Sequence, residues 1–181
     1  MTIITVLVVY ASVVATLALA ISLLLLRSLP TGPSAPAVGH ALALPDSGPD
    51  IGSPAPPFTA RTSTAALFDT AELAGQTHLL GFLSSSCQGC LLALPAMIGY
   101  ASQLPDPRQL ITVIVGDVNA RAAEIEQRLA RLAVIVSEPE GGPIATAYRI
   151  TSFPSFVLVS EAGTVLGAGN SVFDLPLPQR Q

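Results

Sequence analysis

The 181-residue sequence contains little charge, no tryptophan and no lysine. Charged residues make up 11% of it, all basic residues are arginine, and the formal net charge is −4. Proteins that bind nucleic acids concentrate basic residues on one face or in one segment, whereas these arginines are scattered. We therefore expect no nucleic acid as a partner.

Cysteine and histidine are equally scarce, with two residues of each. Cys87 and Cys90 form a Cys-x-x-Cys pair, which is also half of many zinc sites. A structural zinc site needs four ligands, and neither His40 nor His78 belongs to a ligand cluster. We expect no metal and no cofactor, and we expect His78 at the surface. A pair of inert buried thiols is the other alternative.

The two cysteines lie between an apolar run at 79–83, typical of a buried strand, and an apolar helical pattern after Cys90. The N-terminus of a helix offers free backbone N–H groups and the positive end of the helix dipole. Both would stabilise a thiolate at Cys87. Cys90, one turn further, could resolve a mixed disulfide or close the intramolecular one. The spacing thus predicts thiol–disulfide exchange.

The N-terminal segment 3–26 is apolar, carries no charge and ends at Arg27. It is long enough to cross a bilayer and lacks the short core and nearby cleavage site of a signal peptide. We expect an uncleaved anchor over 1–27, in contact with the lipid bilayer. Arg27 alone favours a cytoplasmic C-terminal flank, but disulfide chemistry favours the other side of the membrane. We therefore expect a single-pass cell-membrane protein whose redox domain is extracytoplasmic.

The rest of the chain divides into three parts. Residues 28–57 contain many prolines, which disfavour regular helix and sheet, and we expect an extended tether there. The folded domain is expected over 58–170. Residues 171–181 are expected to be an irregular tail, because prolines interrupt any helix there.

Within the domain, strand and helix patterns alternate and end in a hairpin. Strands are expected at 67–68, 77–83, 110–115, 133–136, 155–160 and 164–167. Helices are expected at 70–73, 87–103, 120–132 and 142–148, with Asp69 or Thr70 capping the first and Asn119 the third. The surface of the third helix carries arginines and glutamates. This order predicts an α/β fold with a central mixed sheet flanked by helices.

The same order resembles the thioredoxin fold. Pro95 stands five residues after Cys90, where thioredoxin-like proteins carry a helix-kinking proline. Phe153-Pro154, just before an expected strand, is similar to their cis-proline, which faces the active-site cysteines. The resemblance spans nearly the whole chain.

Two membrane-anchored groups share further features with the chain. The lead-in at 51–58 resembles the entry to TlpA/ResA-type thioredoxins. The closer resemblance is to MauD-type proteins, accessory proteins of methylamine dehydrogenase, which also begin with an anchor and a Pro/Gly-rich tether. The shared pattern consists of Ala145, Tyr148, Ile150, Pro154, Gly163, Gly169 and Asn170.

The resemblance implies a membrane-tethered thiol–disulfide oxidoreductase that acts on a client protein with cysteines. Cys87 would attack, Cys90 would resolve, and the backbone of Phe153 beside Pro154 would pair with the client chain. It also implies an electron-transfer partner, either a membrane protein or another thioredoxin-like protein, and a MauD-like role in maturation.

Two positions depart from the family pattern. Ser86 replaces the tryptophan that usually precedes the first cysteine, and Gly81 occupies the position of thioredoxin's buried acid. A thioredoxin-fold binding or assembly module with little turnover is therefore the alternative. A peroxidase of the peroxiredoxin type would need proline at Leu80.

Overall fold

The computed structural model describes residues 47–178. The expected anchor over 3–26 and most of the expected tether lie outside this range. Within 47–178, no helix is both long enough and apolar enough to cross a membrane.

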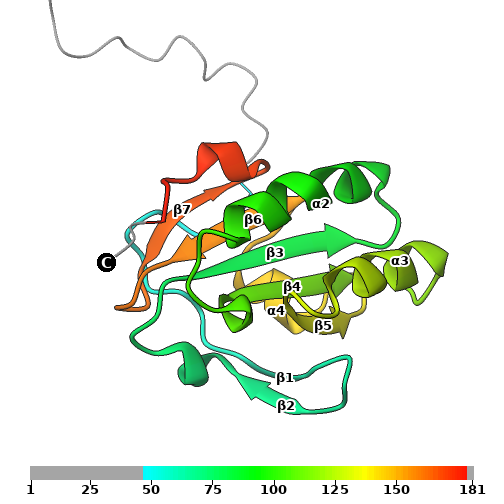
Figure 1. Ribbon diagram of the computed structural model, residues 1–181, viewed down its shortest axis with the longest axis horizontal. Coiled ribbons are helices and arrows are strands. Elements are labelled where there is room, and N and C mark those ends of the chain that lie inside the picture. Colours follow the sequence, from blue (N-terminus) through cyan, green and yellow to red (C-terminus); the bar gives the residue numbers. More distant parts are fainter. Residues whose placement is uncertain (1–46, 179–181) are drawn as a thin grey trace, which may run out of the picture. The chain divides into compact units, whose positions relative to one another are not determined.

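A five-stranded mixed sheet forms the centre of the domain, in the order β5-β4-β3-β6-β7 (Figure 1). Strands β3, β4 and β5 are parallel, and β6 and β7 run antiparallel to their neighbours. The strands are β3 (His78–Ser84), β4 (Leu110–Val115), β5 (Val134–Glu138), β6 (Ser155–Val159) and β7 (Val165–Gly169). All residues of β3, β4 and β6 are buried. Their continuous apolar sequences are explained by this burial on both faces.

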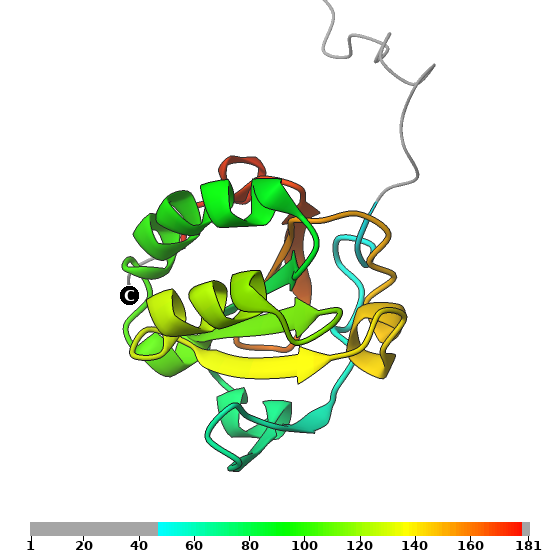
Figure 2. The same cartoon turned by 90° about the vertical axis from the view of Figure 1, so that its right-hand side faces the viewer.

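Helices cover both faces of the sheet (Figure 2). One face packs against α2 (Gln88–Ala101) and α3 (Ala120–Leu129). The other packs against α4 (Pro143–Ala147) and the hairpin β1–β2 (Thr59–Arg61, Leu67–Asp69). Side chains of β3 alternate between the two cores, as the period of a strand requires.

Most expected elements are found, with shifted ends. The strand at 110–115 has the bounds expected from its β-branched run, and Asn119 caps α3 by accepting from the N–H groups of Arg121 and Ala122. The expectation for His78 is wrong. Its side chain is buried, with Nδ1 2.9 Å from the Gln76 carbonyl oxygen.

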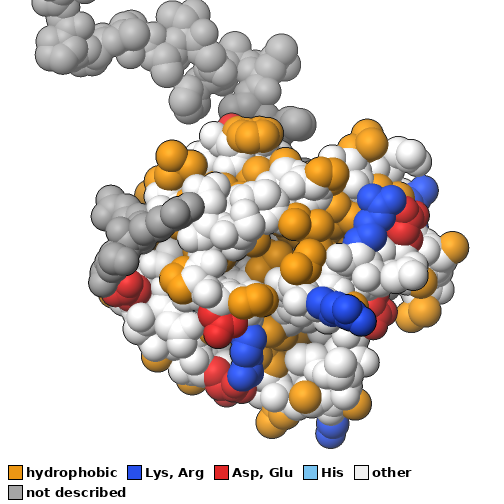
Figure 3. All heavy atoms as spheres, in the orientation of Figure 1, with side chains coloured by type: hydrophobic (Ala, Val, Ile, Leu, Met, Phe, Trp, Pro, Cys, Tyr) orange, Lys and Arg blue, Asp and Glu red, His pale blue; other side chains and the backbone are white. Residues whose placement is uncertain are grey.

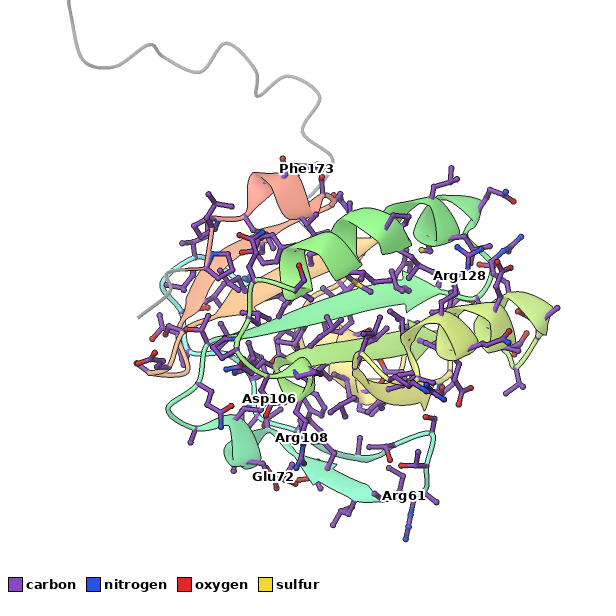
Figure 4. All side chains as sticks on the ribbon, viewed as in Figure 1. Arg61, Glu72, Asp106, Arg108, Arg128 and Phe173 are labelled. Carbon is purple, nitrogen blue, oxygen red and sulfur yellow. The ribbon has the colours of Figure 1, made fainter. Side chains whose placement is uncertain are left out.

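Short 3-10 helices connect the larger elements. The first is η1 (Thr70–Leu73), which Asp69 caps as expected, and the second is η2 (Pro107–Gln109). Glu72 of η1 and Arg108 of η2 lie side by side in Figure 4 and form an exposed ion pair of 2.8 Å.

The N-terminal stretch 47–57, expected to belong to the tether, is bonded to the domain. The N–H of Gly52 donates to the Val165 carbonyl and that of Ala55 to the Gly163 carbonyl, both at 2.8 Å. The prolines lack N–H groups, but the residues between them supply donors. The stretch is therefore part of the fold in the structure, and the domain extends N-terminally at least to Ser47.

The C-terminal stretch also differs from the expected irregular tail. Ser171 caps a third 3-10 helix, η3 (Val172–Asp174), and both Val172 and Leu175 are buried against the core beside α2. The hydroxyl of Tyr100 donates to the Pro176 carbonyl. Apolar side chains at the right spacing thus anchor the segment despite its prolines.

Candidate active site

The Cys-x-x-Cys pair lies where β3 ends and α2 begins. Cys87 is the N-cap of α2 and is half-buried, whereas Cys90, one turn inside the helix, is completely buried. Ser84 shapes the turn between the two elements, since its hydroxyl accepts from the N–H of Ser86 at 3.2 Å. As the N-cap, Cys87 lies next to the free N–H groups of the first helical turn.

Cys90 is buried in a largely apolar environment. Burial raises the pKa of its thiol to about 12, and a hydrogen bond from the Ser84 N–H to Sγ, 3.3 Å, acts in the opposite direction. The neighbouring Cys87 raises this pKa further, and the charge of Arg121 lowers it. Cys90 therefore remains a protonated thiol at neutral pH.

The loop before β6 brings the remaining predicted residues to the cysteines. The Phe153–Pro154 peptide bond is cis, and the Cys87 thiol donates to the Phe153 carbonyl at 3.5 Å. Asn170 fixes the loop from the other side, because its Nδ2 donates to the Pro154 carbonyl at 2.7 Å. All four predicted site residues thus meet at one place, and their roles remain predictions.

Two further side chains at the site were not identified from the sequence. Asn119 Nδ2 and Arg121 Nη1 both donate to the carbonyl oxygen of Ser85, at 3.2 and 3.1 Å. The sequence pattern predicts that the arginines of this helix lie on its solvent face, whereas Arg121 is half-buried. A usable signal did exist, because parallel strands β3 and β4 end at the same side of the sheet and the residues that follow them become neighbours.

The position of thioredoxin's buried acid is filled by a sulfur atom. A Cβ added at Gly81 would lie 2.7 Å from Sδ of Met97. Thr112 pairs with Gly81 in the neighbouring strand, and its buried hydroxyl has no hydrogen-bond partner within the described residues. The same range holds no cluster of three or more residues that could bind a metal ion.

No protein-family model matches the chain. No curated protein matches it either.

Solved structures do match the fold. A thioredoxin-family thiol:disulfide interchange protein from Chlorobium tepidum has a TM-score of 0.54 at 19% identity, covering 66% of this chain and 86% of its own. The thioredoxin domain of a thiol-disulfide oxidoreductase from Bacteroides vulgatus has a TM-score of 0.57 at 18% identity, covering 70% and 92%. A secreted disulfide oxidoreductase of Mycobacterium tuberculosis, homologous to Escherichia coli DsbE, has a TM-score of 0.51 at 22% identity, covering 66% and 87%. The domain described here therefore has the mixed α/β fold of thioredoxin-like proteins.

Proposed function

We propose that the protein is a thiol–disulfide oxidoreductase that acts on disulfides of partner proteins. The observation that carries the proposal is the geometry of the pair. Cys87 is accessible at the start of α2, Cys90 is buried one turn inside, and the Phe153–Pro154 turn lies against the first thiol. The oxidoreductase titles of the structural neighbours are consistent with this proposal.

The reaction proceeds in two exchanges. The thiolate of Cys87 attacks one sulfur of a client disulfide, which forms a mixed disulfide and releases the other client sulfur as a thiolate. Cys90 then gives up its proton and attacks Sγ of Cys87, which forms the intramolecular disulfide and releases the second client thiolate. Two electrons pass from the cysteine pair to the client. The reverse sequence oxidises a client dithiol.

The client docks beside the Phe153–Pro154 turn. The Phe153 carbonyl faces Cys87 and is an acceptor for a backbone N–H of an extended client segment. On the face with α2 and α3, apolar side chains gather between the helices and charged ones are interspersed (Figure 3). Such a face suits a protein partner better than a polyanion.

The membrane location is a second part of the proposal. It rests on the apolar segment 3–26, which would anchor the domain outside the cytoplasm, where it exchanges electrons with a membrane or thioredoxin-like partner. The similarity to MauD-type proteins suggests a maturation role there. Protease added to cells stripped of outer layers should remove the domain. If the domain is as well protected as a cytosolic marker, it lies on the cytoplasmic side, which contradicts the proposed orientation.

Catalysis is tested by insulin reduction with the full-length chain in mild detergent. The wild type should accelerate the reaction, and Cys87→Ser should be inactive. The matched control is Ser102→Ala, which removes an exposed hydroxyl at the far end of α2. Equal activity of wild type and Cys87→Ser would contradict the proposal.

One observation favours the alternative of a binding or assembly module. Met97 occupies the space where a proton-accepting acid would stand beside Gly81, so the resolving thiol lacks that base. If the protein is such a module, the wild type and the Cys87→Ser variant should bind the client equally well. Loss of client handling in the Cys87→Ser variant favours the enzyme.

A further inference from the structure

The hydroxyl of Ser47 is bonded to the loop that carries Phe153. Its Oγ accepts from the N–H of Thr151 at 3.1 Å and from the N–H of Ser152 at 3.3 Å. A third contact, of 2.9 Å, joins it to Oγ of Ser155. Ser47 therefore holds the backbone just before Phe153 and a side chain two residues after it, although 104 to 108 positions separate it from these partners.

The directions of these hydrogen bonds follow from the protons available. The hydroxyl of Ser155 has one proton, which it donates to the Ser152 carbonyl at 2.7 Å. In the contact between the two hydroxyls, Ser47 is therefore the donor. A hydroxyl offers one proton and two acceptor sites, and Ser47 uses all three on this one loop. Ser47→Ala would remove the partner of two N–H groups and of a completely buried oxygen.

The same loop lies against the nucleophile. The Phe153 carbonyl oxygen is 3.5 Å from Sγ of Cys87, and the Pro154 carbonyl accepts from Nδ2 of Asn170 at 2.7 Å. Ser47 and Asn170 thus hold the loop from two segments that are far apart in the sequence. The position of the Phe153 carbonyl beside Cys87 depends on both of them.

We propose that Ser47 is a positioning residue for protein clients, because it fixes the Phe153 carbonyl where an extended client segment would pair with it. This inference rests on the proposed thiol–disulfide exchange. A backbone hydrogen bond tolerates only a narrow range of distances and angles, so a loosened loop weakens docking. A small disulfide without peptide groups has no backbone to pair, and its exchange with Cys87 depends far less on the loop. Ser47 thereby contributes to the preference of the site for proteins over small disulfides.

The test compares two substrates in single turnovers of the reduced full-length chain in mild detergent. Insulin supplies a protein disulfide, and hydroxyethyl disulfide supplies one without peptide groups. In both reactions the protein dithiol becomes the intramolecular disulfide, and two electrons and two protons convert the substrate disulfide to two thiols. Ser47→Ala should lower the rate constant with insulin about three- to tenfold, the effect of about one hydrogen bond. The decrease with hydroxyethyl disulfide should be much smaller.

Three further variants separate these hydrogen bonds from general destabilisation. Ser47→Thr retains the hydroxyl and should restore most of the insulin rate. Ser53→Ala is the matched control, because it removes a hydroxyl of the same N-terminal stretch that donates to the Asp50 carbonyl at 2.7 Å, and it should leave both rates unchanged. Asn170→Asp keeps the size of an exposed side chain but loses the donor to the Pro154 carbonyl. It should lower the insulin rate with the same selectivity as Ser47→Ala.

The outcome for the wild type distinguishes the two levels of the argument. A wild-type chain that does not reduce insulin contradicts the proposed function and this inference together. A wild-type chain that reduces both substrates, with Ser47→Ala changing neither rate or lowering both by the same factor, contradicts this inference alone. Equally low insulin rates of Ser47→Ala and Ser47→Thr would show that the hydroxyl is not the responsible group.

Discussion

The Sγ atom of Cys87 lies 3.5 Å from the carbonyl oxygen of Phe153, although 66 positions separate the two residues in the sequence. The thiol donates to this oxygen, and a thiolate or a disulfide sulfur carries no proton to donate. In the reduced, protonated protein the carbonyl is thus engaged by the enzyme's own sulfur. Loss of the thiol proton therefore leaves this carbonyl oxygen without its hydrogen bond from Cys87.

The two cysteines should differ strongly in reactivity. Limiting iodoacetamide at pH 7 should label Cys87 at least about tenfold faster than Cys90, because the Cys90 thiol is inaccessible and burial raises its pKa to about 12. Peptide mapping of the reduced chain measures the order. Cys90→Ala should retain the fast phase and Cys87→Ala should lose it. Preferential labelling of Cys90 would refute the assignment.

Cys90→Ala should trap clients covalently. Without the resolving thiol, the mixed disulfide between Cys87 and the client persists, since no neighbouring sulfur releases it. The measurement is a non-reducing gel of the tagged full-length variant isolated from cells. Cys87→Ala is the control and should give no adduct. Identical bands from both variants would show that attachment does not involve Cys87.

The reduced protein should lose stability in alkaline solution. Burial raises the pKa of both Cys90 and Tyr100 to about 12, from ordinary values of 9.0 and 10.0. Between these limits the unfolded chain loses protons that the folded chain keeps, so the free energy of unfolding falls as pH rises from about 9 to 12. The slope is at most about 1.4 kcal/mol per pH unit for each group.

Urea unfolding at pH 7.5 and 10.5 measures this decline. Burial also raises the pKa of Tyr148, which adds to the decline. Tyr100→Phe removes one of these titrating groups and should make the decline shallower. A free energy of unfolding that stays constant up to pH 11 would contradict the expectation.

Glu138 should stabilise the helix that leads toward the Phe153 loop. It is buried at the end of β5, and its carboxylate oxygens accept from the N–H groups of Ile144 and Ala145 at 2.9 and 2.7 Å. Glu138→Ala leaves both donors unpaired and should lower the free energy of unfolding by about 2–4 kcal/mol. The exposed Glu140→Ala is the matched control and should change it by less than about 0.5 kcal/mol. Equal effects of the two variants in urea unfolding would contradict the capping role.

Local patterns were enough to predict the central elements. The β-branched run at 110–115 and the capping side chain of Asn119 both encode structure within a few residues, and both are found. The pattern of a buried strand followed by an apolar helix likewise predicts where the cysteine pair lies. These features depend on short-range sequence alone.

Features that depend on contacts distant in sequence were not predicted. The helical pattern predicts a solvent-facing Arg121 and does not reveal its contact with Ser85, which spans 36 positions. A polar residue at the start of an apolar run predicts a surface position for His78. The pattern does not show that the first residue of β3 is already buried. Strand β1 was missed because its three residues are too few for a periodic pattern.

The N-terminal part of the described chain covers parts of both edges of the central sheet. Gly52 donates to Val165 of β7, and Ala55 donates to Gly163 in the turn before β7. Further along the chain, Thr62 and Ser63 pair with β5. The chain thus reaches both edge strands before it enters the sheet. Unpaired edges can pair with strands of other chains. With its own backbone on parts of both edges, the domain leaves less of either edge open to pairing with another chain.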